Sequence, residues 1–470
     1  MKRFPSVVLT LCCCTFGLLT AQAKDDAKGP NVLLIYTDDQ GTLDLNCFGS
    51  KDLFTPNLDA LAKRGIRFTQ AYAHMVCCPS RAPLLTGRYP QRCNVNHWTP
   101  CHPDRNHPFG KGPNMFLDEI TLAEALKPHG YRTALFGKWH LGATPGYGPN
   151  EQGFDEFFGH LGGFIDNYKH AFLHGEDFHD LYRDTKEVRE DGKYFPDLVV
   201  RETNRFLEKN KDRPFFVYAA LNIPHYPEQC DEKFVERYKD LPMPRRSYAA
   251  MISTVDDRVG QILDKINGLG LRDKTLVVYM SDNGHSTESS RNEDGTNYGA
   301  NGGGGNTGKW RGAKGSFLEG GIRTPAIISW PGHIPEDQVR DQAVMNHDFF
   351  PTILEACHVP LPKCKLDGVS LWPILKSADA PSPHKVMHWQ WANQWAVREG
   401  DWKLIVGGRD STSADSGHPQ PKRRMPRIFL GNLAEEQPEL KNHAEEKPEI
   451  VQRLQKLHEE WAKGVFPKKH

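Results

Sequence analysis

Short, almost wholly apolar segments recur along this chain, with helical patterns between them. Residues 31–36 read NVLLIY, and residues 131–136, 215–221 and 276–280 have a similar composition rich in aromatic and β-branched side chains. Uninterrupted apolar runs of this length are typical of strands buried on both faces. Strands that alternate with helices predict an α/β fold, in which a mostly parallel sheet is sandwiched by helices.

The helical patterns carry recognisable start and stop signals. One helix is expected after Thr55, with Pro56 at its first position and Gly65 at its end, followed by a strand over residues 66–72. A second is expected from the capping box that Thr121 and Glu124 form, ending near residue 130. A third, longer helix is expected over residues 247–266.

The pattern changes after about residue 375. Residues 396–398 and 402–406 flank Glu399-Gly400-Asp401, which predicts a β-hairpin. Residues 428–433 predict a further strand, and residues 448–462 an amphipathic helix. We therefore expect a large domain over residues 24–380 and a smaller C-terminal α+β domain, with an antiparallel sheet and a helix, over residues 381–470.

The N-terminal residues are typical of a secretory signal peptide over residues 1–23. Lys2 and Arg3 precede an apolar run over residues 4–19, and Ala21-Gln22-Ala23 offers small residues for cleavage. A membrane anchor is one alternative, but a membrane span needs about 20 apolar residues, and the run over residues 4–19 is shorter. A lipoprotein is the other alternative, but the bulky Leu11 precedes Cys12. We expect an exported protein, periplasmic or secreted, with no stable membrane insertion.

Charge and cysteine content narrow the possible partners. The 59 basic and 59 acidic residues give a net charge of +0, which argues against a nucleic-acid partner. An exported protein can form disulfides, and Cys93 with Cys101 and Cys357 with Cys364 are the shortest pairings among the eight cysteines after the signal segment. The pairing stays open, and no C-x-x-C pair suggests structural zinc.

Polar side chains follow four of the predicted buried strands. Because ligands bind at the carboxyl ends of parallel strands, we expect one site that contains Asp38, Asp39, Lys138, His140, Asn222, His225, Asp282 and Asn283. Several carboxylates crowded together resist ionisation unless a cation lies between them. The oxygen ligands of Asp38, Asp39, Asp282 and Asn283 favour Ca²⁺, with Mg²⁺ as the alternative, over zinc. Helix caps and solvated turns are the competing explanation for such acids.

Residues 77–88, CCPSRAPLLTGR, are the most specific signal in the chain. They resemble the C-x-P-S-R-x-x-x-L-T-G-R signature of type I sulfatases, in which the cysteine is oxidised to formylglycine. This alignment identifies Cys77 as the modified residue. Further segments resemble the metal, lysine and C-terminal hairpin motifs of the same family: residues 31–41, 137–142, 281–284, 312–314 with 319–323, and 397–404.

The resemblance implies an alkaline-phosphatase-like fold and a calcium-dependent sulfuric ester hydrolase. One hydroxyl of the formylglycine hydrate would attack sulfur, and the second would then expel sulfate. In this family the cysteine position also faces the metal. The remaining roles that the resemblance implies are sulfate binding by Lys138 and Lys314, deprotonation of the nucleophile by His140, protonation of the leaving oxygen by His225 with Lys314, and support of the nucleophile and metal carboxylates by Arg81.

The family also implies an enzyme that converts Cys77 to formylglycine and a sulfated carbohydrate as substrate. Residues 97–111, which include Trp98, and residues 160–194 and 285–306 are candidate specificity loops, although Trp98 could equally be a packing residue. Two alternatives stay open: a phosphodiester or phosphonate monoester hydrolase on the same scaffold, and a sulfated-glycan-binding protein without catalysis. Residues 303–309 fit the first part of the G-x-x-x-x-G-K-S/T pattern of a nucleotide-binding loop. Trp310, however, replaces the Ser or Thr that this pattern requires.

Overall fold

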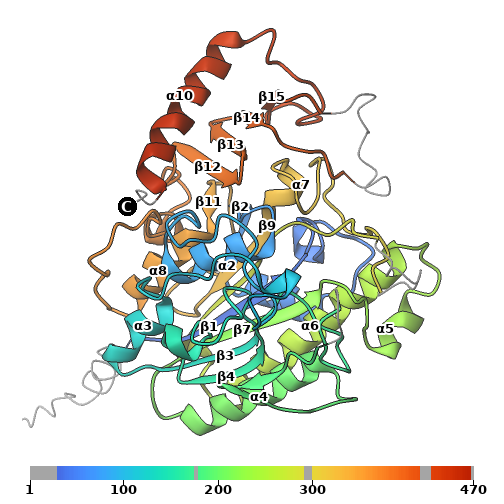
Figure 1. The fold of residues 1–470 in the computed structure, drawn as a ribbon. Coiled ribbons are helices and arrows are strands. Elements are labelled where there is room, and N and C mark those ends of the chain that lie inside the picture. The colour runs from blue at the N-terminus through green and yellow to red at the C-terminus, as the bar shows by residue number, and fades with distance from the viewer. Residues whose placement is uncertain (1–28, 174–177, 290–298, 413–424, 467–470) are drawn as a thin grey trace, which may run out of the picture.

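The structure is a computed structural model that describes residues 29–173, 178–289, 299–412 and 425–466. A large mixed sheet lies between helices, and a small antiparallel sheet with one long helix lies beside it (Figure 1). The large sheet has the strand order β10-β2-β9-β8-β1-β7-β3-β4-β5-β6, and β11 pairs with β2. Its strands are β1 (Asn31–Asp38), β2 (Ile66–Tyr72), β3 (Arg132–Lys138), β4 (Glu156–His160), β5 (Tyr182–Arg183), β6 (Lys186–Glu187), β7 (Phe215–Pro224), β8 (Thr275–Ser281), β9 (Arg323–Ser329), β10 (Gln338–Arg340) and β11 (Val344–Met345).

The centre of the sheet is parallel, as the sequence predicts. β8, β1, β7, β3 and β4 are neighbours and run parallel to one another, whereas β9 runs antiparallel to both β8 and β2. Every residue of β1 is buried because both faces of the sheet are covered. Leu34 faces one apolar core and Leu33 faces the other, as the alternation of side chains along a strand requires.

Helices cover both faces of the large sheet. On one face the core includes residues of α1 (Pro56–Lys63), α4 (Phe195–Asn210) and α6 (Arg245–Gly268), and on the other those of α2 (Cys77–Thr86), α3 (Leu122–Leu126) and α8 (Phe349–Ala356). The capping box of Thr121 and Glu124 forms at the start of α3. Shorter helices are α5 (Glu232–Arg237), α7 (Glu319–Ile322) and α9 (Trp372–Lys376).

The C-terminal part forms the expected antiparallel sheet, which β12 (Val386–Trp391), β13 (Gln394–Glu399), β14 (Trp402–Val406) and β15 (Ile428–Asn432) build in this order. The helix α10 (Pro448–Val465) packs on it (Figure 1). β12 is an edge strand that the sequence analysis does not identify. The Trp389 indole of β12 donates to the Ala73 carbonyl at 2.9 Å, which joins the small sheet to the large one.

Neither local cysteine pair forms a disulfide: Cys93, Cys101, Cys357 and Cys364 are all free. The Cys93 thiol lies in the core beside the Thr86 hydroxyl at 3.4 Å, whereas the Cys101 sulfur lies 3.6 Å from the His140 ring. Short sequence separation therefore does not bring these thiols together. Among the described residues, no helix is long and apolar enough to cross a bilayer, and the proposed signal peptide lies outside the described residues.

Candidate active site

The carboxyl ends of four adjacent strands bring the predicted polar residues together. β1 pairs in parallel with β8 on one side and β7 on the other, and β3 follows β7. The ends of these strands therefore place Asp38 and Asp39, Asp282 and Asn283, His225, and Lys138 and His140 at one edge of the sheet, where all of them are buried. Asn222, near the end of β7, is buried as well, and its amide nitrogen donates to the Asn167 side chain at 2.7 Å.

Three carboxylates and one thiol converge at this edge. Ligand atoms of Asp38, Asp39, Cys77 and Asp282 all lie within 4.8 Å of one another. The Asn283 amide nitrogen donates to Asp39 Oδ1 at 2.7 Å, and the buried Asn283 Oδ1 has no hydrogen-bond partner. An unpaired buried amide oxygen beside three carboxylates fits a hard cation, which takes oxygen ligands.

Backbone geometry orients this cluster. Asp39 adopts a φ of 67°, an unfavourable conformation for a residue with a side chain, and its amide donates to Asp282 Oδ1 at 3.1 Å. The pairing of β1 with β7 shifts its register between Tyr36 and Asp38. β1 ends at Asp38, and the left-handed backbone of Asp39 turns the chain there, so that these two consecutive residues contribute to one cluster although neighbouring side chains of a regular strand point to opposite faces.

Cys77 is the first residue of α2, a helix buried along its whole length. Its thiol donates to Asp38 Oδ1 at 3.2 Å. Arg81 lies four residues later, on the same side of the helix. The Arg81 Nη2 donates to Asp282 Oδ2 at 2.7 Å and lies 3.6 Å from Asp38 Oδ1. The four-residue spacing of Cys77 and Arg81 thus brings the Arg81 guanidinium to the same carboxylates that the Cys77 thiol faces.

Two lysines face the carboxylates from other elements. Lys138 Nζ, at the end of β3, donates to Asp38 Oδ2 at 2.6 Å, and Lys314 Nζ donates to Asp39 Oδ2 at 2.9 Å. Burial alone would lower the pKa of either lysine, but Asp38 holds the pKa of Lys138 above its usual range, and Asp39 with Glu288 does the same for Lys314. Both lysines are therefore positively charged at neutral pH.

Two histidines complete the site. His225 Nδ1 lies 2.8 Å from the carbonyl oxygen of Tyr226, the next residue. Its other ring nitrogen, Nε2, faces Asp39 Oδ2 at 3.6 Å. His140 has a φ of 54°, and its buried Nδ1 has no hydrogen-bond partner. Burial lowers the pKa of both rings, reinforced by Lys314 at His225 and by Lys138 at His140. Both can therefore be neutral at pH 7 and accept a proton.

The carboxylates differ in their affinity for protons. Burial, reinforced by Asp38, raises the pKa of Asp282 to about 7. Burial would also raise the pKa of Asp38, but Lys138, His225 and Arg81 together hold it well below its usual range. Burial next to Asp282 also raises the pKa of the Cys77 thiol well above its usual range. An unmodified Cys77 is thus a neutral thiol, which is a weak nucleophile.

One residue near Lys314 lies within the candidate specificity loop 285–306 but is not among the site residues that the sequence predicts. The exposed Glu288 places Oε2 3.3 Å from Lys314 Nζ, and no motif or strand end marks it. Residues 303–309, which resemble a nucleotide-binding loop, form neither a strand nor a helix. They pass close to His285, because a Cβ at Gly305 would lie 2.1 Å from the His285 ring.

Comparisons with known proteins agree with this arrangement. The family model described as Sulfatase matches residues 30–359. The N-acetylgalactosamine-6-sulfatase of Mus musculus is 31% identical over 98% of this chain and 90% of its own length, and arylsulfatase A of Homo sapiens is 34% identical over 83% and 77%. The crystal structure of Ps i-CgsB in complex with k-i-k-neocarrahexaose is 29% identical, with a TM-score of 0.77 over 92% of this chain and 93% of that one.

The matches to the N-acetylgalactosamine-6-sulfatase and to Ps i-CgsB cover more than nine tenths of this chain, so they extend beyond the family model into the small sheet. The large sheet with its helices and the small antiparallel sheet agree with the alkaline-phosphatase-like fold that the sequence predicts. The family model also covers the four strand ends and α2, which build the cluster described above. The chain therefore belongs to the type I sulfatase family and is a sulfuric ester hydrolase.

Proposed function

We propose that this protein removes sulfate from a sulfated carbohydrate, with a formylglycine made from Cys77 as nucleophile and a calcium ion at the carboxylate cluster. The position of Cys77 carries the proposal: it begins a buried helix with its sulfur 3.2 Å from Asp38, beside charged lysines. The names of the relatives support a sulfated sugar, since one is an N-acetylgalactosamine-6-sulfatase and another was solved with an oligosaccharide.

Four oxygen donors would hold the cation, namely those of Asp38, Asp39, Asp282 and Asn283, with the residue at position 77 facing it. All are buried, and their charge favours Ca²⁺ over a softer metal. When present, the cation would offset charge on the sulfate oxygens, and the formylglycine hydrate would supply one hydroxyl for attack and a second for release of sulfate.

The charged side chains have complementary roles in this proposal. Lys138 and Lys314 would bind the sulfate oxygens, where negative charge accumulates in the transition state. The unpartnered Nδ1 of His140 is available to take the proton of the nucleophile. The charged Lys314 Nζ would deliver a proton to the leaving oxygen, and His225 Nε2, which also faces Asp39, would do so once it has taken up a proton. Arg81 would hold Asp282 and Asp38 in place.

The remaining predictions concern maturation and location. A formylglycine-generating enzyme is the expected partner, and it would have to act before α2 is buried, because only 2% of Cys77 is exposed. We propose export to the periplasm or medium after removal of residues 1–23. We also propose residues 24–380 as the catalytic domain and residues 381–470 as the smaller domain. The small sheet, which begins at Val386, supports this division.

Two measurements test the nucleophile. Mass spectrometry of the peptide that contains Cys77, from protein made in its native host, should show the loss of sulfur that formylglycine formation causes. Cys77→Ala should abolish hydrolysis of an aryl sulfate, whereas Cys78→Ala, on the neighbouring residue, should retain the modification and activity. A wholly unmodified Cys77 in native protein, or an active Cys77→Ala variant, would contradict the mechanism.

A third measurement tests the reaction. Aryl sulfate, aryl phosphate and aryl phosphonate esters of the same phenol should be compared with matured enzyme, before and after chelation and with Ca²⁺ or Mg²⁺ restored. We expect the sulfate to react fastest and Ca²⁺ to restore the most activity. Faster turnover of the phosphorus esters would favour the phosphohydrolase alternative, and full activity after complete removal of metal would contradict the cation site.

A further inference from the structure

The large aromatic side chain of Trp98 is exposed to solvent next to the candidate active site. The exposed fraction of Trp98 is 50%, although tryptophan is usually well buried. Its indole is nearly parallel to the His140 imidazole, with an angle of 15° and 6.2 Å between ring centroids. Because Cys77 and Lys138 are buried, the organic part of a bound sulfate ester must extend outward from them. Trp98 thus lies on the solvent side of the catalytic machinery.

The structure holds Trp98 in place despite its exposure. The indole meets the Trp391 indole edge-on, at 5.3 Å and 77°, and Trp391 ends β12 in the small sheet. The next residue, Thr99, donates through its hydroxyl to the His140 carbonyl at 3.0 Å. Behind it, a Cβ at Gly112 would lie 2.3 Å from the Trp98 carbonyl, so only glycine permits this close approach. A ring fixed before binding loses little entropy when a ligand stacks on it.

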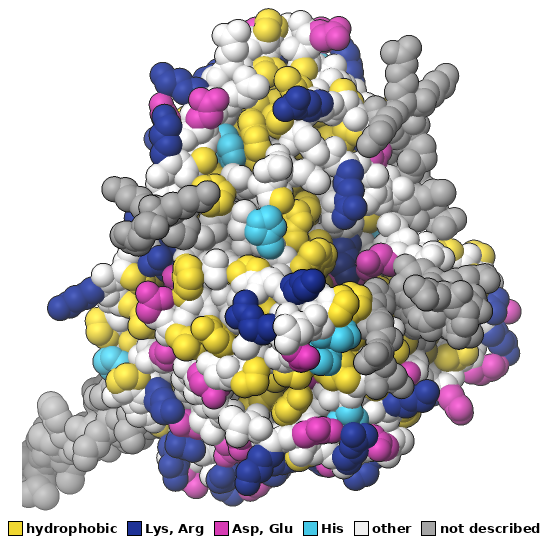
Figure 2. Space-filling view, in the orientation of Figure 1, with side chains coloured by type: hydrophobic (Ala, Val, Ile, Leu, Met, Phe, Trp, Pro, Cys, Tyr) yellow, Lys and Arg dark blue, Asp and Glu magenta, His cyan; other side chains and the backbone are white. Residues whose placement is uncertain are grey.

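A second aromatic ring covers the other histidine. Phe164 stacks on the His225 imidazole at 5.3 Å and 13°. The two histidines that would move protons are therefore each lined by an aromatic ring. Figure 2 shows one face of the molecule, on which hydrophobic, histidine and basic side chains are interspersed in the middle and charged side chains are densest along the lower edge. Such apolar faces next to polar groups suit a sugar ring, which has C–H groups on its faces and hydroxyls on its rim.

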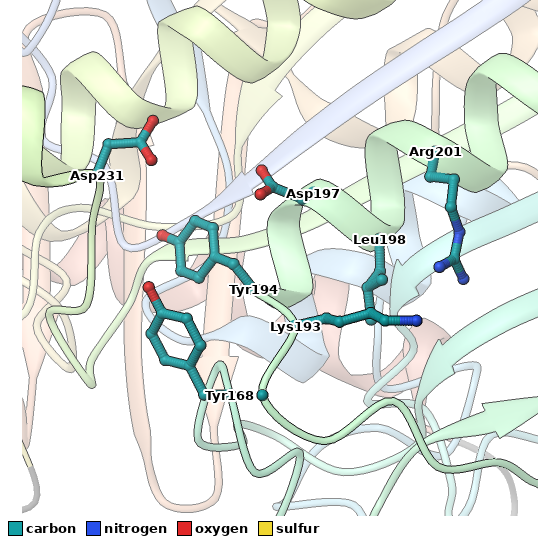
Figure 3. Close-up of a pocket in the computed structure, with 8 residues that line it drawn as sticks. Tyr168, Lys193, Tyr194, Asp197, Leu198, Arg201 and Asp231 are labelled. Atoms are coloured by element: carbon teal, nitrogen blue, oxygen red, sulfur yellow. The ribbon is translucent and has the colours of Figure 1, made fainter.

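A second place where a sugar could bind is the cavity of 590 Å³ near the start of α4 (Figure 3). Tyr168 and Tyr194 contribute its aromatic rings, 5.3 Å apart. Its cations are already neutralised, because Lys193 and Arg201 both pair with Glu190. Asp197 and Asp231 also line it, and both pair with Arg258. None of the residues that line this cavity belongs to the candidate active site, so a sugar ring bound there would contact neither Cys77 nor Lys138.

We propose that Trp98, supported at its edge by Trp391, is the surface on which the sugar ring that carries the sulfate ester stacks. This inference rests on the proposed function, since it takes a sulfated pyranose as the substrate. It adds a binding residue contributed by the loop before Thr99 and stabilised by the small sheet. It also gives the small sheet a part in substrate recognition.

Steady-state kinetics of matured Trp98→Ala, Trp98→Phe and Tyr168→Ala enzymes test this proposal. The substrates are sulfated galactose and N-acetylgalactosamine oligosaccharides that the wild type hydrolyses. Loss of the ring in Trp98→Ala should raise KM about tenfold and leave kcat within about twofold, since the ring binds ground and transition states alike. Trp98→Phe should restore most of the affinity. Tyr168→Ala, a matched exposed aromatic beside the other cavity, should leave KM unchanged.

A binding measurement separates stacking from sulfate chemistry. The desulfated oligosaccharide should inhibit aryl sulfate hydrolysis by the wild type, and its inhibition constant should rise about tenfold in Trp98→Ala. An unchanged KM and inhibition constant in Trp98→Ala would overturn the stacking role, and a larger effect of Tyr168→Ala would place the sugar at the other cavity. If the wild type hydrolyses aryl sulfate but none of the sulfated sugars, the carbohydrate proposal itself fails.

Discussion

The site depends on an arrangement of charge in which nearly every group is buried. Lys138, Arg81 and Asp38 have no solvent exposure, and each charge is compensated by a neighbour at 2.6–3.6 Å. Compensated charges in a buried, low-dielectric site act strongly on a bound anion, because burial reduces their screening by solvent. The residues proposed to act in catalysis are therefore also structural residues, and a variant must be checked for both properties.

At the residue scale, we expect Lys138→Met to lower kcat/KM for an aryl sulfate by roughly 10²–10³-fold, the usual cost of removing one preorganised partner of transition-state charge. Lys209→Met, which removes an exposed lysine paired with Glu156, is the control and should retain activity. Circular dichroism and formylglycine content should match the wild type before rates are compared. A loss below about threefold would exclude Lys138 as a sulfate-binding residue.

At the element scale, the spacing between β3 and β7 determines where Lys138 lies. Gly137 has a φ of 120°, and a Cβ there would lie 1.9 Å from the Ala220 carbonyl of β7. A backbone oxygen cannot move away as a flexible side chain would. Any larger residue at position 137 must therefore separate the two strands and displace the lysine that follows.

Gly137→Ala should accordingly lower the free energy of unfolding by about 2–4 kcal/mol, from overpacking combined with backbone strain. Urea denaturation of the matured protein measures this change. Gly268→Ala is the matched control, because a Cβ at Gly268, the last residue of α6, has no neighbour within 4 Å. Equal stability of the two variants would show that β3 and β7 tolerate the wider spacing.

At the scale of the whole molecule, a buried charge cluster joins the two sheets. Lys403 of β14 contacts Glu319 of α7 at 2.7 Å and Glu439 at 2.6 Å, and all three side chains are fully buried. Burial raises the pKa of Glu439 to about 7, with a smaller contribution from Glu319, although Lys403 opposes the shift. Lys403 therefore faces two acids, and Glu439 stays protonated in the folded state up to about pH 7.

The pH dependence of stability follows from this shift. The unfolded Glu439 carboxyl ionises near 4.5, whereas the folded one does so near 7. The folded state thus binds more protons between these values, and the free energy of unfolding should decrease as pH rises from 4.5 to 7. Urea denaturation across this range should show a shallower decrease for Glu439→Gln, and an unchanged decrease for the exposed Glu436→Gln. Identical pH profiles for both variants would contradict the shift.

The sequence by itself determined the central strands, the main helices, the capping box of α3 and the list of candidate site residues. Apolar runs and caps are local signals, and the polar residues that end each strand follow directly from them. Residues 66–72 form β2 as predicted, and the α2 motif needs only the spacing of Cys77 and Arg81 to place both on one side. The resemblance to the family signature then supplied the formylglycine chemistry proposed for Cys77, which no periodicity reveals.

Only the tertiary structure decided which groups meet. It placed β9 antiparallel within the sheet, left Cys93 and Cys101 unpaired, joined Asn222 to Asn167, and brought Glu288 to Lys314. It also left Trp98 in water against Trp391 of the small sheet. These outcomes depend on contacts between residues far apart in the chain, whose energies are set by packing and burial rather than by local sequence pattern.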